Sequence, residues 1–128
     1  MQDDAPYTYA GANGKSVNNY DRRYRGFTTL REAITDSINI VTVKTLAQAG
    51  VSLGWQYVQE YGFTTVDSRD MNEALALGGI TQGVSNLELT AAYAAIANQG
   101  TYIKPKFYTK ILDHDGNVLI DNTTPESH

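Results

Sequence analysis

The sequence predicts a mainly α-helical fold that ends in a C-terminal β-hairpin. Apolar residues recur at helical spacing between residues 28 and 100, and Thr29–Glu32 and Ser85–Glu88 each form a capping box at a helix start. After residue 100 the spacing changes to short apolar runs on either side of Asp115-Gly116, which is a turn signal. The predicted architecture is therefore a body of four main helices followed by one hairpin.

Residues 1–27 have no helical period, and turn residues such as Gly11–Gly14 interrupt them. Aromatic side chains lie among these turns, namely Tyr7, Tyr9, Tyr20, Tyr24 and Phe27. Buried aromatic rings order a loop that lacks regular structure. We therefore expect residues 1–27 to form an ordered loop rather than a disordered tail.

The helical body covers residues 28–100 and contains two glycine-rich interruptions. A helix is predicted to begin at Ser52 as its N-cap and to end at Gly62. Between Glu73 and Val84, three glycines bracket Ile80-Thr81-Gln82, and the pattern fits either an ordinary loop or the backbone wall of a cleft. The Ser85 helix is rich in alanine and ends near residue 100.

The C-terminal part of the chain changes from helical to extended character. Residues 101–122 are predicted to form the hairpin, with strands at Phe107–Leu112 and Val118–Asp121. Residues 123–128 are polar and predict a tail without a regular element. We expect the 128 residues to form one domain, because this length supports a single core and is too short for two comfortable domains.

Composition excludes several classes of function. The net charge of −4 gives no general attraction to nucleic acid or to an acidic membrane surface. The chain has no cysteine, and its two histidines are not part of a cluster at ligand spacing, so neither a metal site nor a cofactor is expected. No apolar run approaches the roughly 20 residues of a membrane span.

The candidate functional residues are Ser37 and Asn39. Leu30, Ala33, Ile34, Ser37 and Ile38 occupy one helical stripe, so Ser37 places a hydroxyl where the pattern favours leucine. Asn39 favours a helix start, and a second apolar segment follows it. We therefore expect a helix break at Ile38-Asn39, with Asn39 as an N-cap and both polar side chains turned into one cleft. The alternative is that both residues are structural, as cap and small packing residue.

A series of short motifs resembles the transpeptidase domain of class A penicillin-binding proteins. In chain order they are Asp4-Ala5-Pro6, Asn19-Tyr20-Asp21, Tyr24-Arg25-Gly26, Thr29–Ala33, Ser37–Ile40, Ala76–Gly79, Glu88–Ala94, Ala97–Gly100 and Tyr102–Pro105. No single motif is specific, but their order and spacing cover nearly the whole chain. The resemblance implies that this chain is the helical part of the penicillin-binding protein and serine β-lactamase-like transpeptidase fold.

The resemblance also implies a function and roles for two residues. Family members are serine-type D-alanyl-D-alanine transpeptidases that cross-link peptidoglycan stem peptides in the bacterial cell wall, and β-lactams acylate the same serine. Ser37-Ile38-Asn39 matches the family's Ser-x-Asn motif. For Ser37 this implies a proton relay to or from the leaving amine, and for Asn39 an amide that holds the motif lysine and the substrate carbonyl. The parent protein is expected at the extracytoplasmic face of the bacterial cell membrane, with a glycosyltransferase domain.

Two of the family's three motifs are missing from this sequence. No serine is followed three residues later by lysine, and no Lys-Thr/Ser-Gly occurs. The nucleophile motif is expected before residue 1 and the strand motif after residue 128. A segment without the nucleophile should be inactive alone.

Two rival interpretations remain from the sequence. One is a non-catalytic helical binding or interaction module in which Ser37 and Asn39 are structural. The other is self-association of the fragment, because exposed apolar helix faces and the edges of the hairpin favour pairing. Peptidoglycan stem peptides and β-lactams are the partners expected through the full domain.

Overall fold

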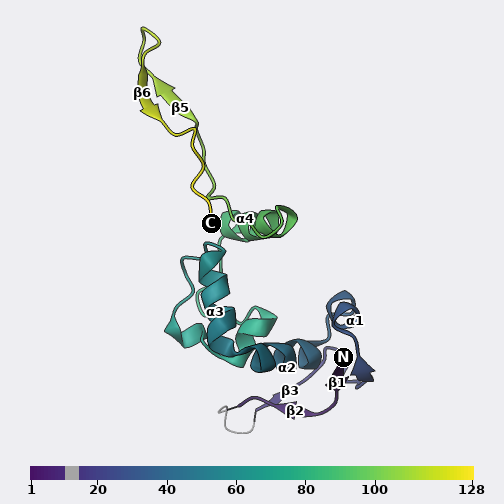
Figure 1. Cartoon of the computed structure of the whole chain (residues 1–128). Helices are drawn as coiled ribbons and strands as arrows, with labels where there is room; N and C mark the ends of the chain where they lie inside the picture. The colour runs from purple at the N-terminus through teal and green to yellow at the C-terminus, as the bar shows by residue number, and fades with distance from the viewer. Residues whose placement is uncertain (11–14) are drawn as a thin grey trace. The chain divides into compact units, whose positions relative to one another are not determined.

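The computed structural model describes residues 1–10 and 15–128, and the predicted turn at Gly11–Gly14 lies outside the described residues. The chain forms two compact units (Figure 1). The first contains Met1–Tyr57 and Val66–Gly83, and the second contains Val58–Thr65 and Val84–His128. Each unit is described separately.

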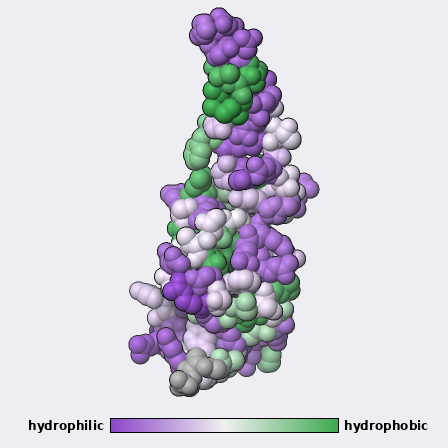
Figure 2. Space-filling model, turned by 90° about the vertical axis from the view of Figure 1, so that its left-hand side faces the viewer, coloured by the Kyte–Doolittle hydropathy of each residue, from purple (hydrophilic) through white to green (hydrophobic). Residues whose placement is uncertain are grey.

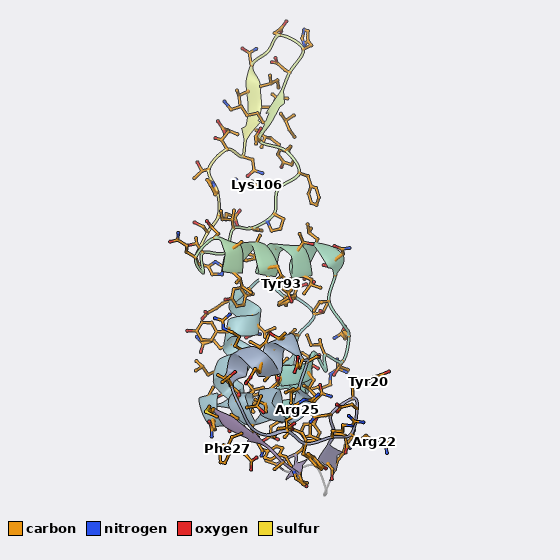
Figure 3. All side chains as sticks on the ribbon, turned by 90° about the vertical axis from the view of Figure 1, so that its right-hand side faces the viewer. Tyr20, Arg22, Arg25, Phe27, Tyr93 and Lys106 are labelled. Atoms are coloured by element: carbon orange, nitrogen blue, oxygen red, sulfur yellow. The ribbon has the colours of Figure 1, made fainter. Side chains whose placement is uncertain are left out.

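Two small antiparallel sheets lie in the N-terminal part of the first unit. Strand β1 (Gln2–Asp4) pairs with β4 (Gly26–Thr28), and β2 (Tyr7–Thr8) pairs with β3 (Ser16–Val17). The segment predicted as a loop therefore contains four short strands. Only some of the aromatic side chains help to order this segment. Tyr7 and Tyr9 pack against the core, whereas 99% of Tyr20 and 77% of Phe27 are exposed (Figure 3).

Three helices follow these sheets. They are α1 (Leu30–Thr35), α2 (Asn39–Ala49) and α3 (Val51–Glu60). The Thr29–Glu32 capping box is present as predicted, with both reciprocal hydrogen bonds. The prediction of Ser52 as an N-cap is wrong, since α3 begins at Val51. An N-cap lies outside the helix with extended backbone, but Ser52 is already the second residue of α3. Gly50, with φ of +100°, turns the chain directly between α2 and α3.

The core of the first unit gathers around α2. Ile40 and Val43 pack with Val17 of β3, and Val41 packs with Ala33 and Ile38. These side chains are almost completely removed from solvent. Burial of an aliphatic side chain of this size contributes about 1.5–3 kcal/mol, so α2 is the element on which this unit is assembled.

Two 3-10 helices complete the first unit. They are η1 (Ser68–Asp70) and η2 (Glu73–Leu77). The buried carboxylate of Asp70 accepts hydrogen bonds from the Thr81 N–H at 2.8 Å and the Thr81 hydroxyl at 2.6 Å. Glu73 accepts a bond from the Tyr7 hydroxyl at 3.0 Å, and Ala76 packs against the core of α2. The connection after α3 is thus tied to the core through carboxylates.

The second unit is built around α4 (Asn86–Ala97), whose predicted Ser85–Glu88 capping box is present. Ala91 and Ala95 of this helix pack on Tyr102 and Tyr61. A Cβ at Gly62 would lie 2.2 Å from the Tyr102 hydroxyl oxygen, so the close approach of this ring requires glycine.

The C-terminal hairpin consists of β5 (Lys110–Leu112) and β6 (Val118–Asp121), joined through the predicted turn. The first strand is shorter than the predicted Phe107–Leu112. All residues of both strands are exposed, and their apolar side chains form a green patch beside the hydrophilic turn in Figure 2. The apolar members are Ile111, Leu112, Val118, Leu119 and Ile120.

Residues 123–128, predicted as a tail without an element, pair with the chain that precedes the hairpin. The Tyr102 N–H donates to the His128 carbonyl at 2.9 Å, and the Lys104 N–H donates to the Glu126 carbonyl at 3.0 Å. The Lys106 ammonium, labelled in Figure 3, donates to the carbonyls of Asn122 and Thr124. These partners are distant in sequence, which is why local pattern did not indicate them. Among the described residues, no helix is long and apolar enough to span a membrane.

The start of α4 generates a prediction about pH. The Thr64 hydroxyl, followed by the N–H groups of Ser85 and Thr64, lowers the pKa of Glu88 from 4.5 to about 2. Because the folded-state pKa is lowered, the contribution of ionised Glu88 to stability is complete above about pH 4.5 and is lost as the pH falls to about 2. We expect a carbon-detected NMR titration of the Glu88 carboxyl to give a midpoint near pH 2. Glu88→Gln should remove the pH dependence of α4 helicity over this interval, and a midpoint at the ordinary value would contradict the prediction.

Candidate functional site

A hydrogen-bonded turn separates α1 from α2 at the position where the sequence predicts a break. The Ser37 N–H donates to the Ile34 carbonyl at 3.3 Å, and the Ile38 N–H donates to the Ala33 carbonyl at 2.8 Å. This pair of bonds is a Schellman motif, and the packing of Ile38 on Ala33 is its usual apolar contact. Ser37 occupies the left-handed position of the motif, with φ of +54°, where glycine is the common residue.

The prediction of Asn39 as an N-cap is wrong. The cap position of α2 is Ile38, which makes no side-chain capping bond, and Asn39 is the first helical residue. The Schellman motif ends on Ile38, so the extended backbone that a cap requires falls on that residue. The Asn39 amide instead donates from Nδ2 to the Asn18 carbonyl at 2.8 Å.

A polar cavity of about 210 Å³ opens beside this turn. Its lining residues are Asn19, Tyr20, Asp21, Arg25, Asp36, Ser37 and Ile38. Ser37 is exposed at the cavity, whereas Asn39 is not one of the lining residues. The structure thus brings Ser37 to a cavity, whereas Asn39 bonds to Asn18, so the expectation that both side chains share one cleft is wrong.

Charged groups on one side of the cavity are paired with each other. Arg25, labelled in Figure 3, lies 2.9 Å from Asp21 and 3.7 Å from the buried Asp4. The Arg23 N–H, and after it the Arg25 guanidinium, hold the pKa of Asp21 below its usual range. Ser37 also lines this cavity, and its hydroxyl can both donate and accept a hydrogen bond, so it can pass a proton or orient a polar ligand.

Sequence reasoning assigned no role to three residues that hold the turn. They are Asp4, Asn18 and Asn19. Asp4 and Asn19 are buried and hydrogen-bonded to each other. At the start of α2, Asn19 accepts from the Ile40 N–H and the Asn18 carbonyl accepts from Asn39. A buried role for Asn19 could have been suspected from its place in a family motif, but nothing local marks Asp4 as its partner.

The glycine-rich stretch is better explained as a turn than as the wall of this cavity. Gly78 has φ of +75° at the end of η2, and a Cβ at Gly79 would lie 2.9 Å from the Ala74 carbonyl oxygen. None of residues 78–83 lines the cavity described above. In the part of the chain that the structure describes, no group of three or more acidic, histidine or cysteine side chains could hold a metal.

Comparisons with known proteins identify the family of this chain. The family model "Penicillin binding protein transpeptidase domain" matches residues 2–128. Penicillin-binding protein 1F of Bacillus subtilis (strain 168) is 43% identical over 104 residues, which cover 81% of this chain and 14% of that protein. Penicillin-binding protein 1A/1B of the same organism is 35% identical over 127 residues, which cover 98% of this chain and 13% of that protein.

A solved structure of a penicillin-binding protein has the same fold over nearly the whole of this chain. The crystal structure of Penicillin-Binding Protein 1A from Haemophilus influenzae matches with a TM-score of 0.79 and 29% identity, over 98% of this chain and 18% of that chain. The chain thus spans about one seventh of the length of its curated relatives. It belongs to the penicillin-binding protein transpeptidase domain family, and its homologues are the class A members.

Proposed function

We propose that this chain is the segment of a peptidoglycan DD-transpeptidase that carries the Ser-x-Asn motif, with Ser37 and Asn39 as its catalytic residues. The observation that carries the proposal is the conformation of Ser37. A non-glycine residue in the left-handed region costs of order 1–3 kcal/mol, and such residues cluster at active sites. Arg22 and Gln99 also have positive φ, but of these three residues only Ser37 lines the polar cavity and belongs to the Ser-x-Asn motif, which supports a use for its hydroxyl.

The proposed reaction is acyl transfer through a serine nucleophile that this chain does not contain. In the complete domain, the Ser37 hydroxyl relays a proton to or from the leaving amine. The Asn39 amide holds the motif lysine and the substrate carbonyl, and the Asn18 carbonyl orients that amide. The Ser-x-x-Lys and Lys-Thr/Ser-Gly motifs are absent from the sequence, so we expect the chain alone to be inactive.

Partners and location follow from the same proposal. Stem peptides and β-lactams bind the complete domain, which works at the extracytoplasmic face of the bacterial membrane. The rival interpretation, a non-catalytic binding module, is favoured by one observation. An apolar cavity of about 310 Å³ lies between α1 and α2, with Leu30 and Leu46 among its lining residues. Such a groove can accept an apolar helix, independently of Ser37.

Acylation by a labelled penicillin distinguishes these proposals. We expect a longer form, which carries this chain with flanking sequence on both sides, to be labelled, and the 128-residue chain to remain unlabelled. Labelling of the short chain would mean that one of its own serines is a nucleophile. Absence of labelling in both would favour the binding module.

Two substitutions of Ser37 separate the effect of its hydroxyl on the acylation rate from the effect of its left-handed backbone on the free energy of unfolding. In the longer form, Ser37→Ala should lower the acylation rate about 10²–10⁴-fold, the usual contribution of general acid–base catalysis. Ser37→Gly should lower the rate equally but leave the free energy of unfolding unchanged or raise it by up to about 1 kcal/mol, because it removes left-handed strain. Unfolding in urea measures the second effect, and a loss of stability in Ser37→Gly would argue for a structural role.

The exposed hairpin generates a prediction for the isolated chain. A two-stranded hairpin is marginally stable in water, and both strands of β5–β6 have an open edge with exposed apolar side chains. We expect the chain to self-associate, with an average mass that rises with concentration in light scattering. Replacing the apolar residues Ile111 and Ile120 by threonine should reduce this rise, and a monomer at high concentration would contradict it.

A further inference from the structure

The helix that carries Asn39 begins without a side-chain cap of its own. Ile38 occupies the cap position and has no group that can accept a hydrogen bond from the first turn. The Asn19 side chain takes this role, since its Oδ1 accepts from the buried Ile40 N–H at 3.2 Å. The capping acceptor of α2 therefore comes from a residue 21 positions earlier in the chain.

Asp4 fixes the orientation of the Asn19 amide. The Nδ2 of Asn19 donates to both carboxylate oxygens of Asp4, at 2.8 and 3.0 Å, and to the Arg23 carbonyl at 2.8 Å. Asp4 is fully buried, and it also accepts from the Arg25 N–H at 2.9 Å. A carboxylate and a carbonyl only accept, so the NH₂ end of Asn19 must face them, and its oxygen must face Ile40.

The residue before Asn19 holds the other end of the same site. The Asn18 carbonyl accepts from the Asn39 Nδ2 at 2.8 Å, while Asn19 itself lines the cavity together with Ser37. One dipeptide thus fixes both the first turn of α2 and the Asn39 side chain. A shift of Asn19 would move both.

We propose that Asp4 and Asn19 are positioning residues for Ser37 and Asn39. This inference rests on the function proposed above. They act through the Ile40 N–H and the Asn18 carbonyl and take no part in the chemistry themselves. Reaction rates depend steeply on such placement, since a displacement of about 1 Å can cost about 10²-fold.

The test uses the complete transpeptidase that contains this chain and labelled penicillin as the probe. Asn19→Ala removes the capping acceptor, and Asn19→Asp places two carboxylates against each other. The double substitution Asp4→Asn/Asn19→Asp restores one amide opposite one carboxylate and keeps an acceptor that can face Ile40. Like Asn19→Asp alone, it leaves the Arg23 carbonyl without its donor, so Asn19→Asp is its reference. A time course gives both the acylation rate constant and the fraction of protein finally labelled.

We expect each single substitution to lower the rate constant about 10–100-fold with little change in the final labelled fraction. The double substitution should react faster than Asn19→Asp, because it removes the contact between two carboxylates, but it should not reach the wild-type rate. Tyr7→Phe is the matched control, because it removes one hydrogen bond, to Glu73, in the same unit and should keep the wild-type rate.

Three outcomes overturn the inference, and a fourth overturns the function on which it rests. A lower labelled fraction at an unchanged rate constant in Asn19→Ala shows a role in folding only. A double substitution that reacts no faster than Asn19→Asp refutes the orientation of Asn19 by Asp4. Absence of labelling in the wild type refutes the proposed function itself, whereas a labelled wild type with an unchanged Asn19→Ala rate refutes this inference alone.

Discussion

The buried hydrogen bonds between Asp4 and Asn19 are the constraint that fixes the geometry of the turn and of the start of α2 in the first unit. A buried carboxylate is tolerated only when donors surround it, and each such bond contributes about 1.5–3 kcal/mol. Asp4 takes its donors from Asn19 and from the backbone of Arg25, which brings β1, the loop of residues 18–25 and the start of α2 together. The apolar residues of α2 can then pack on β3 in a single register.

This arrangement explains why polar residues dominate a region that forms part of a core. The N-terminal segment contributes few large apolar side chains to the interior, and Tyr20 and Phe27 face solvent. Directional bonds replace some of the packing that such a segment lacks. Because these bonds demand particular partners, they also define the geometry of the adjacent turn more sharply than apolar contacts do.

The features that the sequence predicted well are local. Both capping boxes join residues three apart, the break between α1 and α2 lies within three residues of Ser37, and the hairpin turn is a dipeptide. The features that it missed depend on distant partners. The cap of α2 comes from Asn19, residues 123–128 pair beside Tyr102, and the short strands of residues 1–28 exist only as pairs. The position of Ser37 was predictable from its motif, but its left-handed backbone was not.

Why this turn carries serine can be argued from the same contacts. In this chain the left-handed residue of the Schellman motif, Ser37, lies outside both α1 and α2. Ser37 lines the cavity from this turn. The strain of this conformation is offset by the two backbone bonds of the motif and by the contact between Ala33 and Ile38. In the proposed reaction a fixed position of the Ser37 backbone matters more than a conformation without strain. The turn fixes that position, and Asn19 holds the start of the helix that follows it.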